Sequence, residues 1–126
     1  MSKPTVVVLG ASSDRAKFGN ISVRAHVQQG YEVFPVNPKA DEVEGIRAYA
    51  SITDVPAKSV NRITVYLPPK IVLSVLEDIA NLTHDELYLN PGTESDEVLA
   101  KAEELGLDPI RACSIVDLGI SPSEVR

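Results

Sequence analysis

The residue types best suited to chemistry lie in the polar segment GASSDRAKFGN, residues 10–20, which directly follows a short apolar, β-branched run. Its first residue, Gly10, allows a sharp turn and a close approach to a ligand. The backbone N–H groups of residues 11–13 and the start of a following helix can hold an anion, and Arg15 and Lys17 add positive charge nearby. We interpret the segment as a phosphate-binding loop, although any turn between a strand and a helix is often rich in Gly and Ser.

The net charge of the chain limits the kinds of anionic ligand that it can bind. Its 126 residues include 12 Lys and Arg against 18 Asp and Glu, a net charge of −6. Such a chain is poorly suited to nucleic acid or an anionic membrane, which need a cationic surface. Residues 1–40 are nevertheless basic, with Lys3, Arg15, Lys17, Arg24 and Lys39 against Asp14 and Glu32. We therefore expect one small anionic ligand.

Apolar runs that alternate with helical patterns set the expected fold. Strands are expected at 5–9, 31–36, 61–67, 86–89 and 109–113, and helices at 21–29, 69–80 and 95–105. This alternation predicts an α/β, three-layer Rossmann-like fold. Its five-stranded parallel sheet would have the order 3-2-1-4-5, with helices on both faces. The length suits one domain, residues 1–126, with 119–126 as a peripheral tail.

Ligands bind such sheets outside the carboxyl ends of the strands, where the strand order reverses. We therefore expect the site to consist of residues from the loops at this edge of the sheet. They contain the candidates Gly10, Ala11, Ser12, Ser13, Arg15, Lys17, Asn37, Pro38, Lys39, Leu67, Pro68, Pro69, Pro91, Gly92 and Cys113.

Two features of the sequence argue against a binding site for NAD. The Gly-x-Gly-x-x-Gly spacing is missing after the first strand, and the second strand ends in Asn37-Pro38-Lys39 without the acidic residue that binds ribose hydroxyls. A lysine at this point suits an additional phosphate on the ribose. The ligand would then carry the 2′-phosphate of NADP or the 3′-phosphate of coenzyme A.

Three short motifs together resemble a known family. Gly10-Ala11-Ser12 follows the first strand, Pro35-Val-Asn-Pro38 ends the second, and Pro68-Pro69 opens the helix expected at 69–80. This order is similar to that of the small stand-alone CoA-binding proteins, which are related to the CoA-binding domain of succinyl-CoA synthetase. The resemblance extends from Val6 to about Leu118. It implies that the loops at the carboxyl ends of the first three strands line a CoA groove, bordered by the Asn90–Gly92 turn and Cys113.

The resemblance does not imply catalysis by this chain. Related synthetases use a phosphorylated histidine in a separate domain, whereas His26 and His84 are not expected at the carboxyl edge. Cys113 could form a mixed disulfide with the CoA thiol, or it is a small buried apolar residue. Tyr49 either folds over the ligand or packs its loop against the sheet. No metal site is expected.

The sequence thus favours binding of CoA or a short acyl-CoA without catalysis. The alternatives are a small NADP-type oxidoreductase and a degenerate Rossmann interaction or regulatory module. The expected partner is the small-molecule ligand, with a partner enzyme or a homodimer also possible, and with neither nucleic acid nor membrane. The single cysteine and the lack of a signal peptide or a long apolar stretch favour the cytoplasm.

Overall fold

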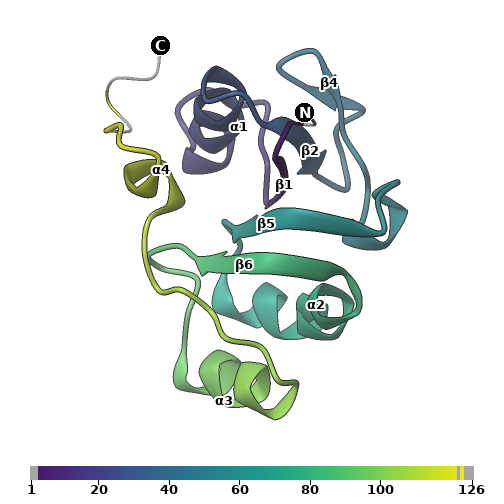
Figure 1. Ribbon diagram of the computed structural model, residues 1–126, viewed down its shortest axis with the longest axis vertical. Helices are drawn as coiled ribbons and strands as arrows, with labels where there is room; N and C mark the ends of the chain where they lie inside the picture. The colour runs from purple at the N-terminus through teal and green to yellow at the C-terminus, as the bar shows by residue number, and fades with distance from the viewer. Residues whose placement is uncertain (1–2, 122, 124–126) are drawn as a thin grey trace.

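The computed structural model describes residues 3–121 and residue 123. The chain forms a parallel sheet with helices on both faces, plus a small hairpin and a short 3-10 turn (Figure 1). The elements in chain order are β1 (Thr5–Leu9), α1 (Phe18–Gln28), β2 (Glu32–Val36), β3 (Glu42–Val43), β4 (Ile46–Arg47), η1 (Ile52–Asp54), β5 (Ser59–Val65), α2 (Pro69–Asn81), β6 (Thr83–Leu89), α3 (Asp96–Glu104) and α4 (Ser114–Asp117). The α/β class with parallel strands is confirmed. Among the described residues, no helix is both long and apolar enough to cross a membrane.

The main sheet has four strands rather than the five expected, in the order β2-β1-β5-β6. Residues 109–113 do not form a strand, because only Ile110 pairs with β6. The Ile110 N–H donates to Leu87 O at 2.7 Å, and its carbonyl accepts from Leu89 N–H at 2.9 Å. The preceding Pro109 has no N–H to extend this ladder.

The expected strand order, 3-2-1-4-5, is also wrong. The third parallel strand, β5, pairs with β1 on the side opposite to β2. At the start of these strands, Thr5 N–H donates to Asn61 Oδ1 at 2.9 Å and Asn61 N–H donates to Thr5 Oγ1 at 3.0 Å. Apolar runs show that a strand is buried but do not identify its neighbour, so the sequence pattern could not decide the order. The strand order therefore reverses between β1 and β5.

Two apolar layers enclose the sheet. Helices α2 and α3 cover one face, and α1 and α4 cover the other (Figure 1). The larger core joins β1 and β5 to Leu76 of α2 and Val98 of α3. On the other face, Ala25 of α1 packs with Ile115 of α4. The prediction of helices on both faces is confirmed.

Local signals account for several helix ends. Pro69 occupies the first position of α2, where its missing N–H costs nothing. The Ser95 hydroxyl accepts from Val98 N–H at 3.2 Å and caps α3. Gly30 follows α1 with a φ of 86°. The Ser51 hydroxyl likewise accepts from Thr53 N–H at the start of η1.

The long connection between β2 and β5 closes the outer edge of β2. Tyr49 N–H donates to Pro35 O at 2.9 Å, and Asn37 N–H donates to Tyr49 O at 2.9 Å. The Tyr49 ring packs near Phe34, with 6.2 Å between the ring centroids. Of the two interpretations of Tyr49, the structure supports packing of the loop against the sheet.

The short helix α4, which the sequence did not indicate, is attached to the sheet by polar contacts. Ser114 N–H donates to Asn90 Oδ1 at 2.9 Å, and the Ser114 hydroxyl lies 2.8 Å from Thr64 Oγ1. Asp117 accepts from the buried Arg62 guanidinium at 2.8 Å. In the region expected to be a peripheral tail, Ile120 still packs on the α1–α4 contact, and residues 122 and 124–126 lie outside the described residues.

Candidate functional site

A groove runs along the carboxyl edge of the sheet and consists of three adjoining hollows. The first, of about 390 Å³, lies where β2 and β1 end; the second, of about 470 Å³, lies where β1 and β5 end. They share Gly10, Lys17, Tyr66 and Leu67. The third, of about 250 Å³, shares Phe18, Tyr66 and Pro91 with the second. The groove therefore crosses the point where the strand order reverses, as expected for a ligand site in this architecture.

Two glycines allow the main chain to pack closely in the middle of this groove. Gly10 has a φ of 86°, and a Cβ there would overlap the carbonyl oxygen of Tyr66. A Cβ on Gly19 would overlap the carbonyl oxygen of Gly10. The start of α1 therefore lies directly on the loop after β1, which in turn lies directly on the end of β5.

The loop after β1 is ordered by its own polar groups. The Ser12 hydroxyl accepts from Asp14 N–H at 3.0 Å, and Asp14 Oδ1 accepts from Ala16 N–H at 3.0 Å. The Asp14 carbonyl then accepts from Lys17 N–H at 3.1 Å. These local turns hold the loop in one shape before any ligand arrives.

Main-chain donors remain available in this loop. The carbonyls of Ala11 and Ser12 accept from the side-chain amides of Asn37 and Asn20, each at 2.9 Å. Within the described chain, the N–H groups of Ala11, Ser12 and Ser13 donate no hydrogen bond. Free N–H groups beside a lysine and a helix start suit a phosphate.

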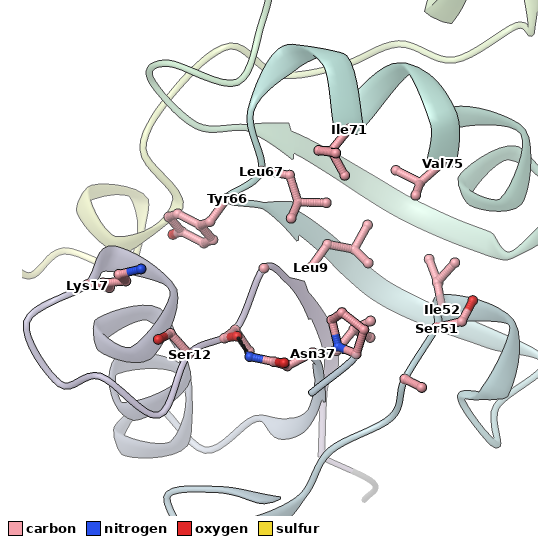
Figure 2. A pocket seen from close by; sticks show the side chains of 15 residues that line it. Leu9, Ser12, Lys17, Asn37, Ser51, Ile52, Tyr66, Leu67, Ile71 and Val75 are labelled. Atoms are coloured by element: carbon pink, nitrogen blue, oxygen red, sulfur yellow. Dashed lines mark hydrogen bonds between the residues drawn. The ribbon is translucent and has the colours of Figure 1, made fainter. Parts of the chain in front are cut away.

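The first hollow has a polar and an apolar end. Figure 2 shows Ser12, Lys17 and Asn37 on one side, with Ile52, Ile71 and Val75 on the other. Ile71 is 47% exposed, although it is a large apolar residue. An apolar ligand group placed against it would remove that surface from water. The hollow thus suits a ligand that combines an apolar ring with phosphates.

Most of the candidate site residues meet in this groove, but three do not. Gly10, Ala11, Ser12, Lys17, Asn37, Pro38 and Leu67 line the first hollow, Pro68, Pro69, Pro91 and Gly92 line the second, and Cys113 lines the third. Arg15 lies outside it and pairs with Glu44 at 3.6 Å. Ser13 and Lys39 are exposed and do not line the three hollows, although Lys39 N–H donates to Asn37 Oδ1 at 2.7 Å. Among the described residues that line the three hollows, Lys17 is the basic one.

The third hollow, which we call the Cys113 pocket, is lined by Phe18, Tyr66, Asn90, Pro91 and Cys113. Its polar groups already have partners. The Asn90 amide donates to Thr64 Oγ1 at 2.7 Å and to Val65 O at 2.8 Å, and its oxygen accepts from Ser114 N–H. The Tyr66 hydroxyl lies 2.9 Å from Ser114 Oγ. Burial raises the pKa of the Tyr66 phenol, so it stays protonated at neutral pH.

The two histidines lie outside the groove. His26 is fully buried in α1, and its Nδ1 is 2.8 Å from Ser22 O. Because a carbonyl only accepts, Nδ1 carries the proton and Nε2 faces Arg62 Nη1 at 3.5 Å. Burial is the main reason that the pKa of His26 falls to about 4. His84 lies in β6, where its Nδ1 is 2.7 Å from Leu82 O.

Sequence reasoning missed several groove residues. Phe18 and Gly19 open α1, and Ser51 and Ile52 come from the irregular connection before β5. Phe18 is 57% exposed, which is unusual for a phenylalanine. The second glycine of the GASSDRAKFGN segment was the one available signal, since a glycine inside a helix often marks close packing.

The sequence matches a protein family over nearly all of its length. The family described as "CoA binding domain" matches residues 4–119. The alpha subunit of an ADP-forming acetate–CoA ligase II from Pyrococcus furiosus is 35% identical over 72 residues, which are 56% of this chain and 16% of that protein. An ADP-forming 4-hydroxybutyrate–CoA ligase from Nitrosopumilus maritimus is 30% identical over 112 residues, 86% of this chain and 16% of that protein. The chain thus spans about a sixth of these relatives.

Solved structures have the same fold. A conserved hypothetical protein from Pyrococcus furiosus superimposes with a TM-score of 0.80 at 33% identity, covering 92% of this chain and 99% of that one. A dinucleotide-forming acetyl-coenzyme A synthetase 1 from Ca. Korarchaeum cryptofilum, in complex with phosphate and ADP, gives 0.71 at 28% identity over 86% of this chain and 25% of the synthetase. The parallel sheet, the loop after β1 and the match over residues 4–119 agree, and the chain belongs to the CoA-binding domain family.

Proposed function

We propose that this chain binds coenzyme A or a short acyl-CoA in the groove at the carboxyl edge of the sheet. The observation that carries the proposal is the continuity of the three hollows, from Asn37 at one end to Cys113 at the other. CoA is a long ligand with an apolar ring, several phosphates and a thin arm. The groove offers surfaces of matching chemistry in that order.

The adenine ring would occupy the apolar end of the first hollow. Leu67, Ile71 and Ile52 offer apolar surface there, and Ser51 adds a hydroxyl. Such a mixture of apolar walls and a few polar groups is typical of small-molecule sites.

The phosphates would lie over the loop after β1. Free N–H groups of Ala11, Ser12 and Ser13 would bind the pyrophosphate, and Lys17 would add a full positive charge. Lys39, on the turn held by Asn37, would neutralise the 3′-phosphate. Arg15 could contribute only by leaving Glu44.

The pantetheine arm would follow the second hollow past Leu67, Pro68 and Pro69, and then Pro91 and Gly92. Proline rings present a rigid, mostly apolar surface that suits a thin chain with few charges. The thiol end would arrive at Cys113. In this arrangement we expect binding without catalysis, since the Tyr66 hydroxyl is protonated and hydrogen-bonded to the Ser114 hydroxyl.

An NADP-type reductase is the main alternative. Its phosphate contacts would use the same loop, so the two ligands compete for one groove. The names of the relatives favour CoA, because both ADP-forming ligases are described as CoA ligases.

A binding comparison tests the proposal. Titration calorimetry with CoA, dephospho-CoA, NADPH and ADP should show that CoA binds most tightly. At a hundred-fold excess over its Kd, CoA should stabilise the folded state by about 2.7 kcal/mol in thermal unfolding. Stabilisation by NADPH without any by CoA would overturn the proposal, and no effect of either ligand would favour an interaction module.

A further inference from the structure

The Cys113 pocket has a size and a chemistry of its own. Its volume of about 250 Å³ equals that of roughly eight water molecules at ~30 Å³ each. It adjoins the second hollow through Phe18, Tyr66 and Pro91, so a chain that leaves the second hollow at this end can continue into it. This is more room than a thiol needs.

The lining of the pocket is apolar and uncharged. The rings of Phe18, Tyr66 and Pro91 form its walls, and none of its five lining residues carries a formal charge. The polar atoms of Asn90 and Tyr66 already bond to Thr64, Val65 and Ser114. A carboxylate placed here would lose its water and find no cation among the five lining side chains, which weakens its binding.

We propose that the Cys113 pocket holds the acyl group of a short-chain, uncharged acyl-CoA and excludes acyl groups that end in a carboxylate. This inference rests on the proposed function, because it places the CoA part in the two adjoining hollows. It adds the class of acyl group that the groove selects. Phe18 is 57% exposed, and an acyl chain beside its ring would cover that surface.

The affinity should follow the length of the acyl chain. Each buried methylene group contributes about 0.8 kcal/mol, which is about four-fold in Kd. Butyryl-CoA should therefore bind about 16-fold more tightly than acetyl-CoA. Succinyl-CoA has the same number of acyl carbons as butyryl-CoA but ends in a carboxylate, and it should bind at least about ten-fold more weakly than butyryl-CoA.

The experiment is a calorimetric titration of the unmodified chain with CoA, acetyl-CoA, propionyl-CoA, butyryl-CoA and succinyl-CoA. A thiol reductant in the buffer prevents a disulfide between Cys113 and free CoA from imitating tight binding. A rise in affinity from acetyl to butyryl, together with weak binding of succinyl-CoA, supports the inference. If CoA binds but the acyl series is flat, or if succinyl-CoA equals butyryl-CoA, the inference is overturned and the proposed function stands. If no CoA species binds, the proposed function itself fails.

One variant tests whether the preference for longer acyl chains arises in the Cys113 pocket. Cys113→Leu fills part of the volume and should reduce the butyryl-to-acetyl affinity ratio from about 16 to near 1. Val116→Leu is the control, because Val116 lies on α4 with 58% exposure and outside the pocket. It should keep the ratio of the unmodified chain. An unchanged ratio in folded Cys113→Leu would show that the acyl chain lies elsewhere and would overturn the inference.

Discussion

The side-chain amide of Asn37 donates a hydrogen bond of 2.9 Å to the main-chain carbonyl of Ala11. The bond joins the turn after β2 to the loop after β1. The Asn37 oxygen also accepts from Lys39 N–H at 2.7 Å and from Ala40 N–H at 3.2 Å. One side chain therefore fixes the turn that carries Lys39 relative to the loop that carries Lys17.

Asn37→Asp tests this connection with almost no change in size. The carboxylate can still accept from Lys39 and Ala40, but it cannot donate to Ala11 O. We expect a loss of about 1–3 kcal/mol in the free energy of unfolding. CoA affinity should fall at least about ten-fold, because a negative charge would lie beside the phosphates. Urea unfolding and calorimetry measure the two effects.

The control for this variant is Asn81→Asp. Asn81 is exposed at the end of α2 and lies outside the groove, so the same change of charge there should leave CoA affinity within about two-fold. Equal losses of affinity in the two variants would mean that total charge, rather than the contact with Ala11, controls binding.

Lys39→Glu tests the assignment of the 3′-phosphate. Affinity for CoA should fall about ten-fold, since a charge-assisted contact becomes a repulsion. Affinity for dephospho-CoA, which lacks the 3′-phosphate, should hardly change. Lys58→Glu, at an exposed position just before β5, is the matched control. The assignment is wrong if Lys39→Glu weakens both ligands equally.

Much of this architecture could be predicted from local patterns. The run Thr5–Leu9 is apolar at every position but its first, and the structure buries it within the parallel sheet. Pro69 and Ser95 correctly indicated where two helices begin. These signals act over a few residues and do not depend on contacts with distant parts of the chain. For that reason they were reliable.

The predictions that were wrong or incomplete concern residues whose positions depend on contacts with residues far away in the sequence. Residues 109–113 are apolar except for Arg111, as in a strand, but only Ile110 finds a partner on β6. In the site, the loops after the strands were expected, whereas Phe18 and Ile52 were not. Phe18 reaches the groove because α1 begins there, and Ile52 because the connection between β2 and β5 passes there. The spacing of nearby residues in the sequence does not indicate either position.

Gly19→Ala tests the close packing between α1 and the loop. In an ordinary helix this substitution stabilises by about 1 kcal/mol. Here the added methyl group overlaps Gly10 O, so we expect destabilisation of about 1–3 kcal/mol. Displacement of the loop should also weaken CoA binding, measured by calorimetry at a temperature where the variant is folded.

Gly30→Ala is the comparison for Gly19→Ala. It places a side chain at a φ of 86°, but nothing lies within 4 Å of the new methyl group. It should cost about 1–2 kcal/mol of stability and leave CoA affinity unchanged. A stable Gly19→Ala variant with normal affinity would contradict the packing described for the groove.

His26 should make the fold sensitive to acid. Its pKa is about 4 when folded, against 6.5 when unfolded, so below pH 6.5 the unfolded chain binds a proton that the folded chain does not. The contribution of neutral His26 to the free energy of unfolding is fully present above pH 6.5 and is lost as the pH falls toward 4. The loss between pH 7 and pH 5 should be about 2 kcal/mol.

Urea unfolding of the His26→Gln variant measures this contribution. The variant should be less stable than the unmodified chain at pH 7 but should lose about 2 kcal/mol less between pH 7 and pH 5. Parallel pH profiles for the His26→Gln variant and the unmodified chain would show that His26 is not the group responsible.

The two short pairings at the sides of the sheet have a consequence for how copies of the chain meet. Tyr49 pairs with β2 and Ile110 pairs with β6, and both do so near the carboxyl ends of these outer strands. Unpaired strand edges are the usual starting points for sheet extension between molecules. Close to the groove, those backbone positions are already occupied. At high concentration, copies of the chain are therefore not expected to extend the sheet edge to edge beside the groove, which stays open.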